Sequence, residues 1–259
     1  MNPIAQFRED VSREIKLMGG DKGLINSTRS WMNLANAHKY SYHFDWMGRP
    51  IIQYPQDILM IQELVWRIKP DLIIETGIAH GGSLILSASM LALLDMSDAI
   101  EQGKTLDHST SKRKVLGVDI DIRDHNRAEI ESHPMGSRIQ MIEGSSIAPG
   151  VIEQVRSIAN NYATVLIFLD SNHTHDHVLA ELNSYAQLTS VGSYCVVFDT
   201  VIEDLPVDMF PNRPWTRGNN PKTAVKKFLE THHEFQIDKS IQDKLQITVA
   251  PDGYLKRIS

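Results

Sequence analysis

Short, almost purely apolar runs alternate with amphipathic stretches along most of the chain. Such runs, each ending in Gly or an acidic residue, are typical of buried parallel strands. They lie at residues 71–77, 113–121, 137–144, 163–170 and 192–199. The stretches between them have helical spacing and cover residues 56–68, 81–94, 125–132, 148–159 and 176–188. Strands interleaved with helices form βαβ units, so the pattern predicts an α/β fold with a doubly wound, mostly parallel sheet.

The two ends of the chain depart from this alternation. Residues 1–54 combine an amphipathic helix, a Gly-rich turn and the aromatic stretch HKYSYHFDW, which predicts an arm or lid before a single core domain of residues 55–259. Near the end, a helix at residues 222–233 is followed by two apolar segments around turns. These predict an antiparallel edge of a seven-stranded sheet. Residues 95–114 are polar and aperiodic, and we expect a mobile loop there.

Composition narrows the range of partners. The formal charge of −6, without a Lys/Arg-rich run, argues against nucleic-acid binding and favours a small-molecule or glycan acceptor. No apolar run approaches the ~18 residues of a membrane span, and the first residues lack the apolar centre of a signal peptide. We therefore expect a cytoplasmic protein without a membrane span. The single cysteine, Cys195, lies in an apolar run and is expected in the core. The aromatic arm suggests a homo-oligomer.

A Gly-rich turn, ETGIAHGGS, follows the first strand at residues 75–83. Its glycines allow a ligand to approach the backbone, and the helix start offers free N–H groups. The spacing differs from the GxGxxG fingerprint, and Glu75 would repel a pyrophosphate. Glu75 suits an amine, Ser83 a carboxylate, and Asp119, at the end of the next strand, a ribose diol. Together these groups indicate S-adenosylmethionine, unless the turn is only a tight connection that Asp119 caps.

Two further acids, Asp170 and Asp199, end strands that are far apart in the chain. Because the carboxyl ends of parallel strands meet at one edge, both side chains could bind one Mg²⁺ or another divalent cation. His173 follows closely, and an imidazole suits a general base at neutral pH. The alternative is a polar loop in which Asp176 caps the next helix.

Two other metal sites are weighed against this one. The stretch HTHDH places three His in five residues, but on a turn and helix start their rings would not converge on one zinc ion. His43 and Asp45 have the HxD form of an iron oxygenase site, which belongs on a β-sandwich or barrel strand. For His175 and His177 we expect partly exposed polar positions.

With these residues in view, the chain resembles the cephalosporin hydroxylase family of class I S-adenosylmethionine-dependent methyltransferases, related to Mg²⁺-dependent sugar O-methyltransferases. The resemblance runs from residue 44 to the end and rests on the stretches WMGRPIIQYPQDI, ETGIAHGGS, LDSNHTHDHV, VFDT, RPWTRGNNPKTAV and ITVAPDGYLKRI. It implies a cofactor site lined by Glu75, Gly77, Ser83, Asp119, Ser146 and Asp170, metal ligands Asp170 and Asp199, and His173 as base. The implied reaction is methyl transfer to a hydroxyl of a sugar, glycosylated metabolite or polysaccharide.

One departure concerns the metal. Metal-dependent members of the family carry Glu-Asp at the end of the last parallel strand, whereas Phe198 precedes Asp199 here. The third ligand would then be lost, be replaced by Thr200, or come from Glu203 or Asp204. A non-catalytic protein that holds the cofactor is the alternative.

The acceptor is less readable from the chain. Aromatic residues that could stack on sugar rings, or simply pack, are His38, Tyr40, Tyr42, Trp46 and Trp215.

Overall fold

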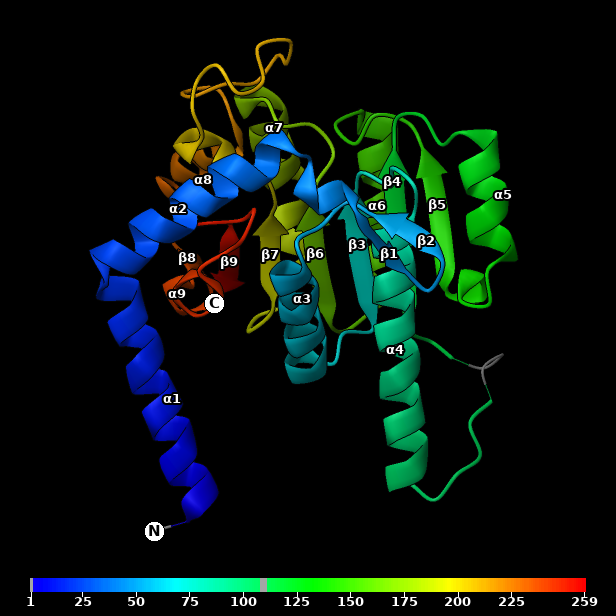
Figure 1. The fold of residues 1–259 in the computed structure, drawn as a ribbon. Helices are drawn as coiled ribbons and strands as arrows, with labels where there is room; N and C mark the ends of the chain where they lie inside the picture. The colour runs from blue at the N-terminus through cyan, green and yellow to red at the C-terminus, as the bar shows by residue number, and fades with distance from the viewer. Residues whose placement is uncertain (1, 108–110) are drawn as a thin grey trace.

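A seven-stranded sheet of order β5-β4-β3-β6-β7-β9-β8 forms the centre of the molecule (Figure 1). The computed structural model describes residues 2–107 and 111–259. The strands are β3 (Leu72–Thr76), β4 (Lys114–Asp119), β5 (Ile139–Glu143), β6 (Val165–Leu169), β7 (Tyr194–Val197), β8 (Phe235–Ile237) and β9 (Tyr254–Arg257). The strands β3 to β7 run parallel, and β9 is antiparallel to both β7 and β8. The predicted sheet with its antiparallel edge is confirmed.

The order of the strands reverses beside β3. From β3 the chain moves outward through β4 and β5, then returns to β6 on the other side. Thr76 at the end of β3 lies opposite Val118 of β4 and Leu169 of β6. In open parallel sheets, ligands bind beyond the carboxyl ends of the strands at such a switch point. This edge is therefore where a site is expected.

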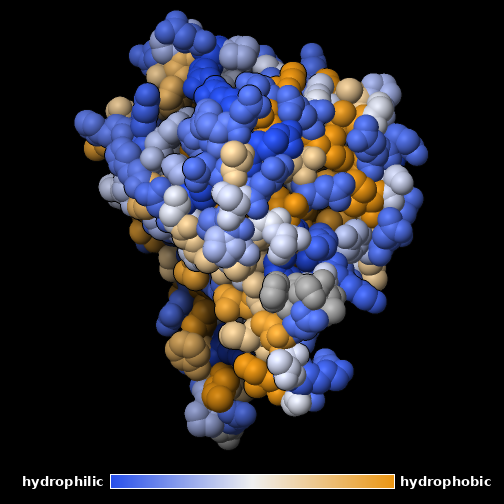
Figure 2. Space-filling model, turned by 90° about the vertical axis from the view of Figure 1, so that its right-hand side faces the viewer, coloured by the Kyte–Doolittle hydropathy of each residue, from blue (hydrophilic) through white to orange (hydrophobic). Residues whose placement is uncertain are grey.

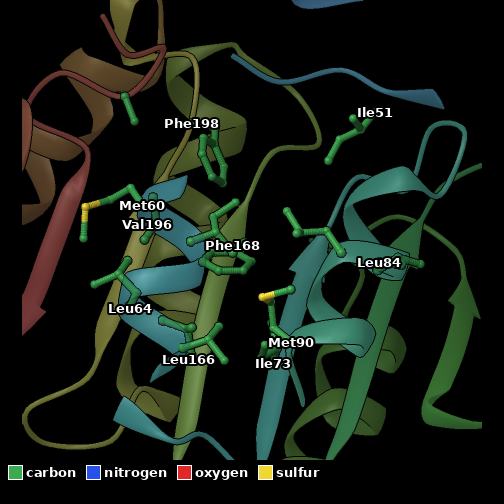
Figure 3. Packing of buried hydrophobic residues seen from close by; sticks show 14 of the residues in the cluster. Ile51, Met60, Leu64, Ile73, Leu84, Met90, Leu166, Phe168, Val196 and Phe198 are labelled. Atoms are coloured by element: carbon green, nitrogen blue, oxygen red, sulfur yellow. The ribbon is translucent and has the colours of Figure 1, made fainter. Parts of the chain in front are cut away.

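Helices cover both faces of the sheet. They are α3 (Pro55–Ile68), α4 (Gly82–Glu101), α5 (Asp124–Ser132), α6 (Pro149–Ala159), α7 (His175–Tyr185), α8 (Pro221–Leu229) and α9 (Lys239–Leu245). Because side chains alternate along a strand, Ile73 of β3 belongs to one core cluster together with Leu64 of α3 and Leu84 of α4 (Figure 3). Its neighbours Leu72 and Ile74 pack into a second core under α6, α7 and α8. Both faces are thus sealed, as the continuous apolar strands require.

The N-terminal arm contains two helices where the sequence predicts one. They are α1 (Pro3–Gly20) and α2 (Lys22–Ala37), followed by a hairpin of β1 (Phe44–Trp46) and β2 (Arg49–Ile51). The Asp21 side chain accepts hydrogen bonds from the N–H groups of Gly23 and Leu24, which starts α2 within the predicted turn. Helix α1 has no buried residue and projects from the body (Figure 1), whereas Ile51 and Tyr54 belong to the main core. The domain boundary at residue 55 stays a prediction.

Helix α4 runs to Glu101 and corrects the loop expected from residue 95. Asp95, in its fourth turn, forms ion pairs with Arg113 (2.6 Å) and Arg138 (2.5 Å). These charge pairs, rather than apolar periodicity, hold the end of the helix. Residues 108–110 of the predicted loop lie outside the described residues.

Helix α4 is also, within the described ranges, the one helix long and apolar enough by length and composition to cross a membrane. Leu84, Ile85 and Leu91 are fully buried, so its first half is a core helix of the domain. Beyond it, Met96 and Ile100 are exposed, and Figure 2 shows apolar residues on this lower part of the molecule. Such residues are compatible with self-association. The homo-oligomer and the cytoplasmic location both stay predictions.

The C-terminal segments are shorter strands than the sequence suggests. After Ile237, the Asp238 side chain accepts from the N–H of Ser240 and starts α9 in place of a longer strand. Residues 245–249 do not form a strand either, because Thr248 and the Val249 N–H donate to the buried carboxylate of Asp57 in α3. The predicted Pro-Asp-Gly turn then leads into β9.

Candidate functional site

A cavity of about 480 Å³ opens at the carboxyl ends of the parallel strands. It includes residues of the Gly-rich turn after β3, the ends of β4 and β6, and the segment after β7. The sequence-predicted site residues that line it are Gly77, Ser83, Asp119, Asp170, His173 and Asp199. Glu75, Ser146 and Thr200 are not among the lining residues. The topology therefore brings together side chains from four separate strand ends.

Gly77, directly after β3, lies against the backbone of the loop that follows β6. Its φ is +91°, a left-handed value that favours glycine. A Cβ there would lie 2.2 Å from the carbonyl oxygen of Asp170 and 3.0 Å from the Cα of Ser171. The absence of a side chain thus allows the Gly-rich turn to lie against the loop that carries Asp170.

Asp119 binds the backbone of the Gly-rich turn. Its Oδ2 accepts from the N–H groups of Ile78 (2.7 Å) and Ala79 (3.3 Å), and its Oδ1 accepts from the Asp121 N–H (3.2 Å). This is the loop-capping role that the sequence left as an alternative. Asp119 also lines the cavity, and its contact with a ribose stays a prediction.

Glu75 lies beneath the cavity with one oxygen unused. The side chain is 3% exposed, and its Oε1 accepts a hydrogen bond from the Ser83 hydroxyl. Its Oε2 has no hydrogen-bond partner among the described residues. Burial raises the pKa of Glu75 to about 8, against the lowering effect of Ser83. A buried carboxylate with a free oxygen fits a cationic amine, such as that of S-adenosylmethionine, because an opposite charge offsets its loss of hydration.

Replacing Glu75 with glutamine should change how stability depends on pH. Between the ordinary glutamate pKa of 4.5 and the folded pKa of about 8, the folded chain keeps a proton that the unfolded chain has released. Wild-type stability should therefore fall as the pH rises through this range, and the variant should lack that part of the fall. Urea unfolding of both proteins at pH 5 and pH 8 measures the difference. If the unfolding free energies of wild type and variant change equally between pH 5 and pH 8, Glu75 is ionised in the folded protein over this range.

Asp170, His173 and Asp199 form a group that could hold a metal ion. One ligand atom from each lies within 4.8 Å of the others, and His173 Nε2 is 3.2 Å from Asp199 Oδ2. Gln53 donates to Asp170 Oδ2 at 3.2 Å. Burial raises the pKa of Asp170 well above its usual range, and the nearby charges of Asp199 and Glu75 raise it further. A divalent cation would relieve this repulsion with ligands that it prefers, so the residues fit such an ion.

Phe198 does not reach this group. It is buried, and its ring centroid lies 5.9 Å from that of Phe168 in the core (Figure 3). Among the described His, Cys, Asp and Glu residues, His173 is the one that completes the group with the two aspartates.

The other suggested third ligands have different partners. The Thr200 hydroxyl donates to the Pro251 carbonyl at 2.7 Å. Glu203 accepts from Asn220 and from the Gly218 N–H, and Asp204 pairs with Lys222. A metal-binding role of Thr200 stays a prediction.

The neighbouring His residues of HTHDH face separate partners. His175 Nδ1 lies 2.8 Å from the Thr223 hydroxyl, and His177 Nε2 lies 3.0 Å from the hydroxyl of the buried Ser146. Both side chains are half-buried, as the sequence predicted, and each is hydrogen-bonded to another element. Ser146 does not line the cavity, and its hydroxyl contacts His177 instead. Its place beside an adenine stays a prediction. Of the oxygenase pair, His43 packs against Tyr40 and Asp45 is exposed.

The far end of the cavity, which we name the acceptor end, comes from the arm and from the loop before α8. It is lined by Lys39, Tyr42, Phe210, Arg213 and Trp215. The Trp215 ring lies edge-on to His173, with centroids 5.9 Å apart. The sequence identified Tyr42 and Trp215, and Arg213 begins the stretch RPWTRGNNPKTAV, but no motif marks Lys39 or Phe210.

Two other aromatic candidates pack within the fold. Trp46 Nε1 donates to the Ser89 hydroxyl at 3.0 Å. The Tyr40 ring packs against the rings of Trp31 and Tyr54.

Comparison with known proteins agrees with this geometry. The model of the family Rhamnosyl O-methyltransferase/CmcI matches residues 38–258. The chain belongs to this family. The rhamnosyl O-methyltransferase of Mycobacterium leprae is 29% identical over 214 residues, covering 82% of each chain. That of Mycobacterium bovis BCG is 29% identical over 217 residues, covering 82% of this chain and 77% of the relative. The chain is thus an S-adenosylmethionine-dependent O-methyltransferase, as the sequence predicted.

Solved structures show the same fold for this methyltransferase. A CmcI structure with Mg-SAM is 15% identical with a TM-score of 0.55, covering 84% of this chain and 78% of that chain. A CmcI apo-structure is also 15% identical, with a TM-score of 0.54 and coverage of 84% and 77%. At this identity the likeness concerns the fold alone, a class I methyltransferase sheet with added N-terminal elements.

Proposed function

We propose that this methyltransferase methylates a hydroxyl of a sugar or glycosylated metabolite, with Asp170 and Asp199 holding a divalent cation and His173 acting as general base. The observation that carries the proposal is the convergence of these three side chains in one cavity with the Gly77 turn. A bound cation would orient the acceptor hydroxyl and lower the cost of its deprotonation.

The reaction needs a proton acceptor beside the attacking oxygen. The hydroxyl oxygen forms a bond to the methyl carbon, the bond from that carbon to sulfur breaks, and S-adenosylhomocysteine leaves with the electron pair. His173 Nε2 faces Asp199 at 3.2 Å, which leaves Nδ1 to take the hydroxyl proton. The Asp199 carboxylate would orient the ring and stabilise the imidazolium that results.

Aromatic side chains support a sugar as the acceptor. Trp215 and Tyr42 line the acceptor end, where an aromatic face could lie against the apolar face of a sugar ring. Contact between Trp215 and His173 would bring such a ring close to the base. The name of the relatives makes a rhamnoside the first acceptor to test.

Binding and turnover test the proposal separately. Calorimetry should detect S-adenosylmethionine binding, and methyl transfer to a rhamnoside should require Mg²⁺ and stop with EDTA. His173→Ala should lower kcat by about 10² to 10⁴ with little change in cofactor affinity. The exposed His125 provides the matched control, His125→Ala, which should behave as wild type.

Three results would count against this function. Folded protein that does not bind S-adenosylmethionine at millimolar ligand would exclude it, and full turnover by His173→Ala would exclude the base. Cofactor binding without transfer to any glycoside would instead favour the non-catalytic alternative.

A further inference from the structure

The acceptor end of the cavity carries positive charge without a matching negative charge. Lys39 and Arg213 both line it. Within the described part of the chain, neither forms an ion pair with a carboxylate, whereas other cations such as Arg113 and Arg138 do. The acids that line the cavity are Asp119, which binds the Gly-rich turn, and the two aspartates of the metal group. The chain as a whole has a charge of −6, so two cations without an ion pair at one end of the cavity are unusual for it.

Arg213 is positioned by its neighbours. Its guanidinium carbon lies 6.0 Å from the centroid of the Trp215 ring, within reach of a cation–π contact. The backbone N–H of Arg213 donates to the Phe210 carbonyl at 3.2 Å. Trp215 also contacts His173. The Arg213 guanidinium, the Trp215 ring and the His173 imidazole therefore lie one after another along one wall of the cavity.

Lys39 faces the same space from the arm. Its φ of 53° is left-handed, an uncommon conformation for a residue other than glycine. Its N–H donates to the Asn36 carbonyl at 2.9 Å, and Asn36 lines the cavity as well. This conformation ends α2, because the residue after a helix C-cap is commonly left-handed, and it turns the chain so that Lys39 lines the cavity.

We propose that the methyl acceptor carries an anionic group, a carboxylate or a phosphate, which Lys39 and Arg213 bind while the sugar ring lies against Trp215. This proposal rests on the proposed function and adds the acceptor's charge to it. The distances from guanidinium to Trp215 (6.0 Å) and from Trp215 to His173 (5.9 Å) place the cation at most about 12 Å from the imidazole. One or two sugar rings span that separation, so the anion lies on the methylated sugar or on its neighbour.

Binding of an anion by Lys39 and Arg213 would give the enzyme a preference for charged acceptors over neutral ones. A chain with a net negative charge repels anions in general, whereas two unpaired cations at the acceptor end favour an anion there. Both side chains are exposed, so each contact is modest and depends on salt. The expected result is a preference among acceptors rather than an absolute requirement.

Matched ligands test the proposal on the full chain loaded with S-adenosylhomocysteine and Mg²⁺. Calorimetry compares a glucoside with the corresponding glucuronide and 6-phosphate, which share one ring. At low salt the charged ligands should bind about tenfold more tightly than the neutral one. The preference should shrink as salt is added and should be lost in the double variant Lys39→Gln, Arg213→Gln. Arg217→Gln, in the same loop but outside this cavity, should keep it.

The outcomes separate the two proposals. Equal binding of neutral and charged ligands, or a preference that survives the double variant, overturns the anionic acceptor even if methyl transfer is found. A charge preference that the double variant removes supports it, even if no ligand is methylated and the proposed function fails. If only the glucuronide binds more tightly than the glucoside, the anionic group of the acceptor is a carboxylate. If only the 6-phosphate does, it is a phosphate.

Discussion

Replacing Asp199 with asparagine should lower methyl transfer by about a hundredfold, equivalent to about 2.7 kcal/mol, without loss of stability. Asp199 has a left-handed φ of 54°, which asparagine tolerates well. The substitution keeps the shape of the side chain and removes its charge. Repulsion from Asp199 contributes to the raised pKa of Asp170, so the ligand-free variant should be as stable as wild type or more stable.

Because activity should fall while stability is kept or rises, measuring both separates a catalytic role of Asp199 from a structural one. Turnover at saturating S-adenosylmethionine and thermal unfolding without ligand are compared in both proteins, together with Mg²⁺ titration by calorimetry. Asp208→Asn, at an exposed position, controls for the loss of one charge. A variant that loses stability and activity together would assign Asp199 a structural role instead.

Replacing Gly77 with alanine should destabilise the protein by about 3 kcal/mol and abolish cofactor binding. The added Cβ would meet backbone atoms of Asp170, which cannot move aside as a flexible side chain could. The left-handed φ adds a second penalty. If the turn is forced away from the β6 loop, Asp170 moves relative to the Gly-rich turn, and the cavity changes shape.

Gly192→Ala separates these two effects. Gly192 has a φ of +86° but nothing within 4 Å of an added Cβ, so it reports the conformational cost alone. Urea unfolding should show a clearly smaller loss for Gly192→Ala than for Gly77→Ala, with S-adenosylmethionine affinity unchanged. Equal losses would mean that the close approach of the Gly-rich turn to the Asp170 loop matters little.

The sheet could be predicted because its strands are buried on both faces. Strands such as Val165–Leu169 are then continuous apolar runs, and the helices between them have clear periodicity. The prediction was wrong where polar contacts decide the structure. Ion pairs of Asp95 extend α4, and the Asp21 side chain starts α2 inside a turn that appeared to end the first helix.

Part of the site followed from topology alone. Acids that end parallel strands must meet at one edge, so the approach of Asp170 to Asp199 could be expected from their places in the chain. Phe198 raised doubt about the metal because the family pattern places an acid there. Its ring packs on Phe168 in the core, while Asp199 faces the cavity.

The acceptor end could not be foreseen in this way. Lys39 and Arg213 are 174 positions apart and belong to irregular segments. Only the folded arm and the loop before α8 bring them into one cavity. Neither apolar periodicity nor a local motif predicts that these two side chains line the same cavity.

The two ends of the cavity differ in how they are built. One part of the lining consists of strand termini whose backbone atoms are fixed by the sheet, whereas the acceptor end is formed by the arm and an irregular loop. Surface segments tolerate insertion and exchange far better than strand ends do. Under the proposed function, exchange of these surface segments would change which hydroxyl is methylated without altering the strand ends proposed to bind the methyl donor. A designer seeking new acceptors would therefore replace the loops and keep the sheet.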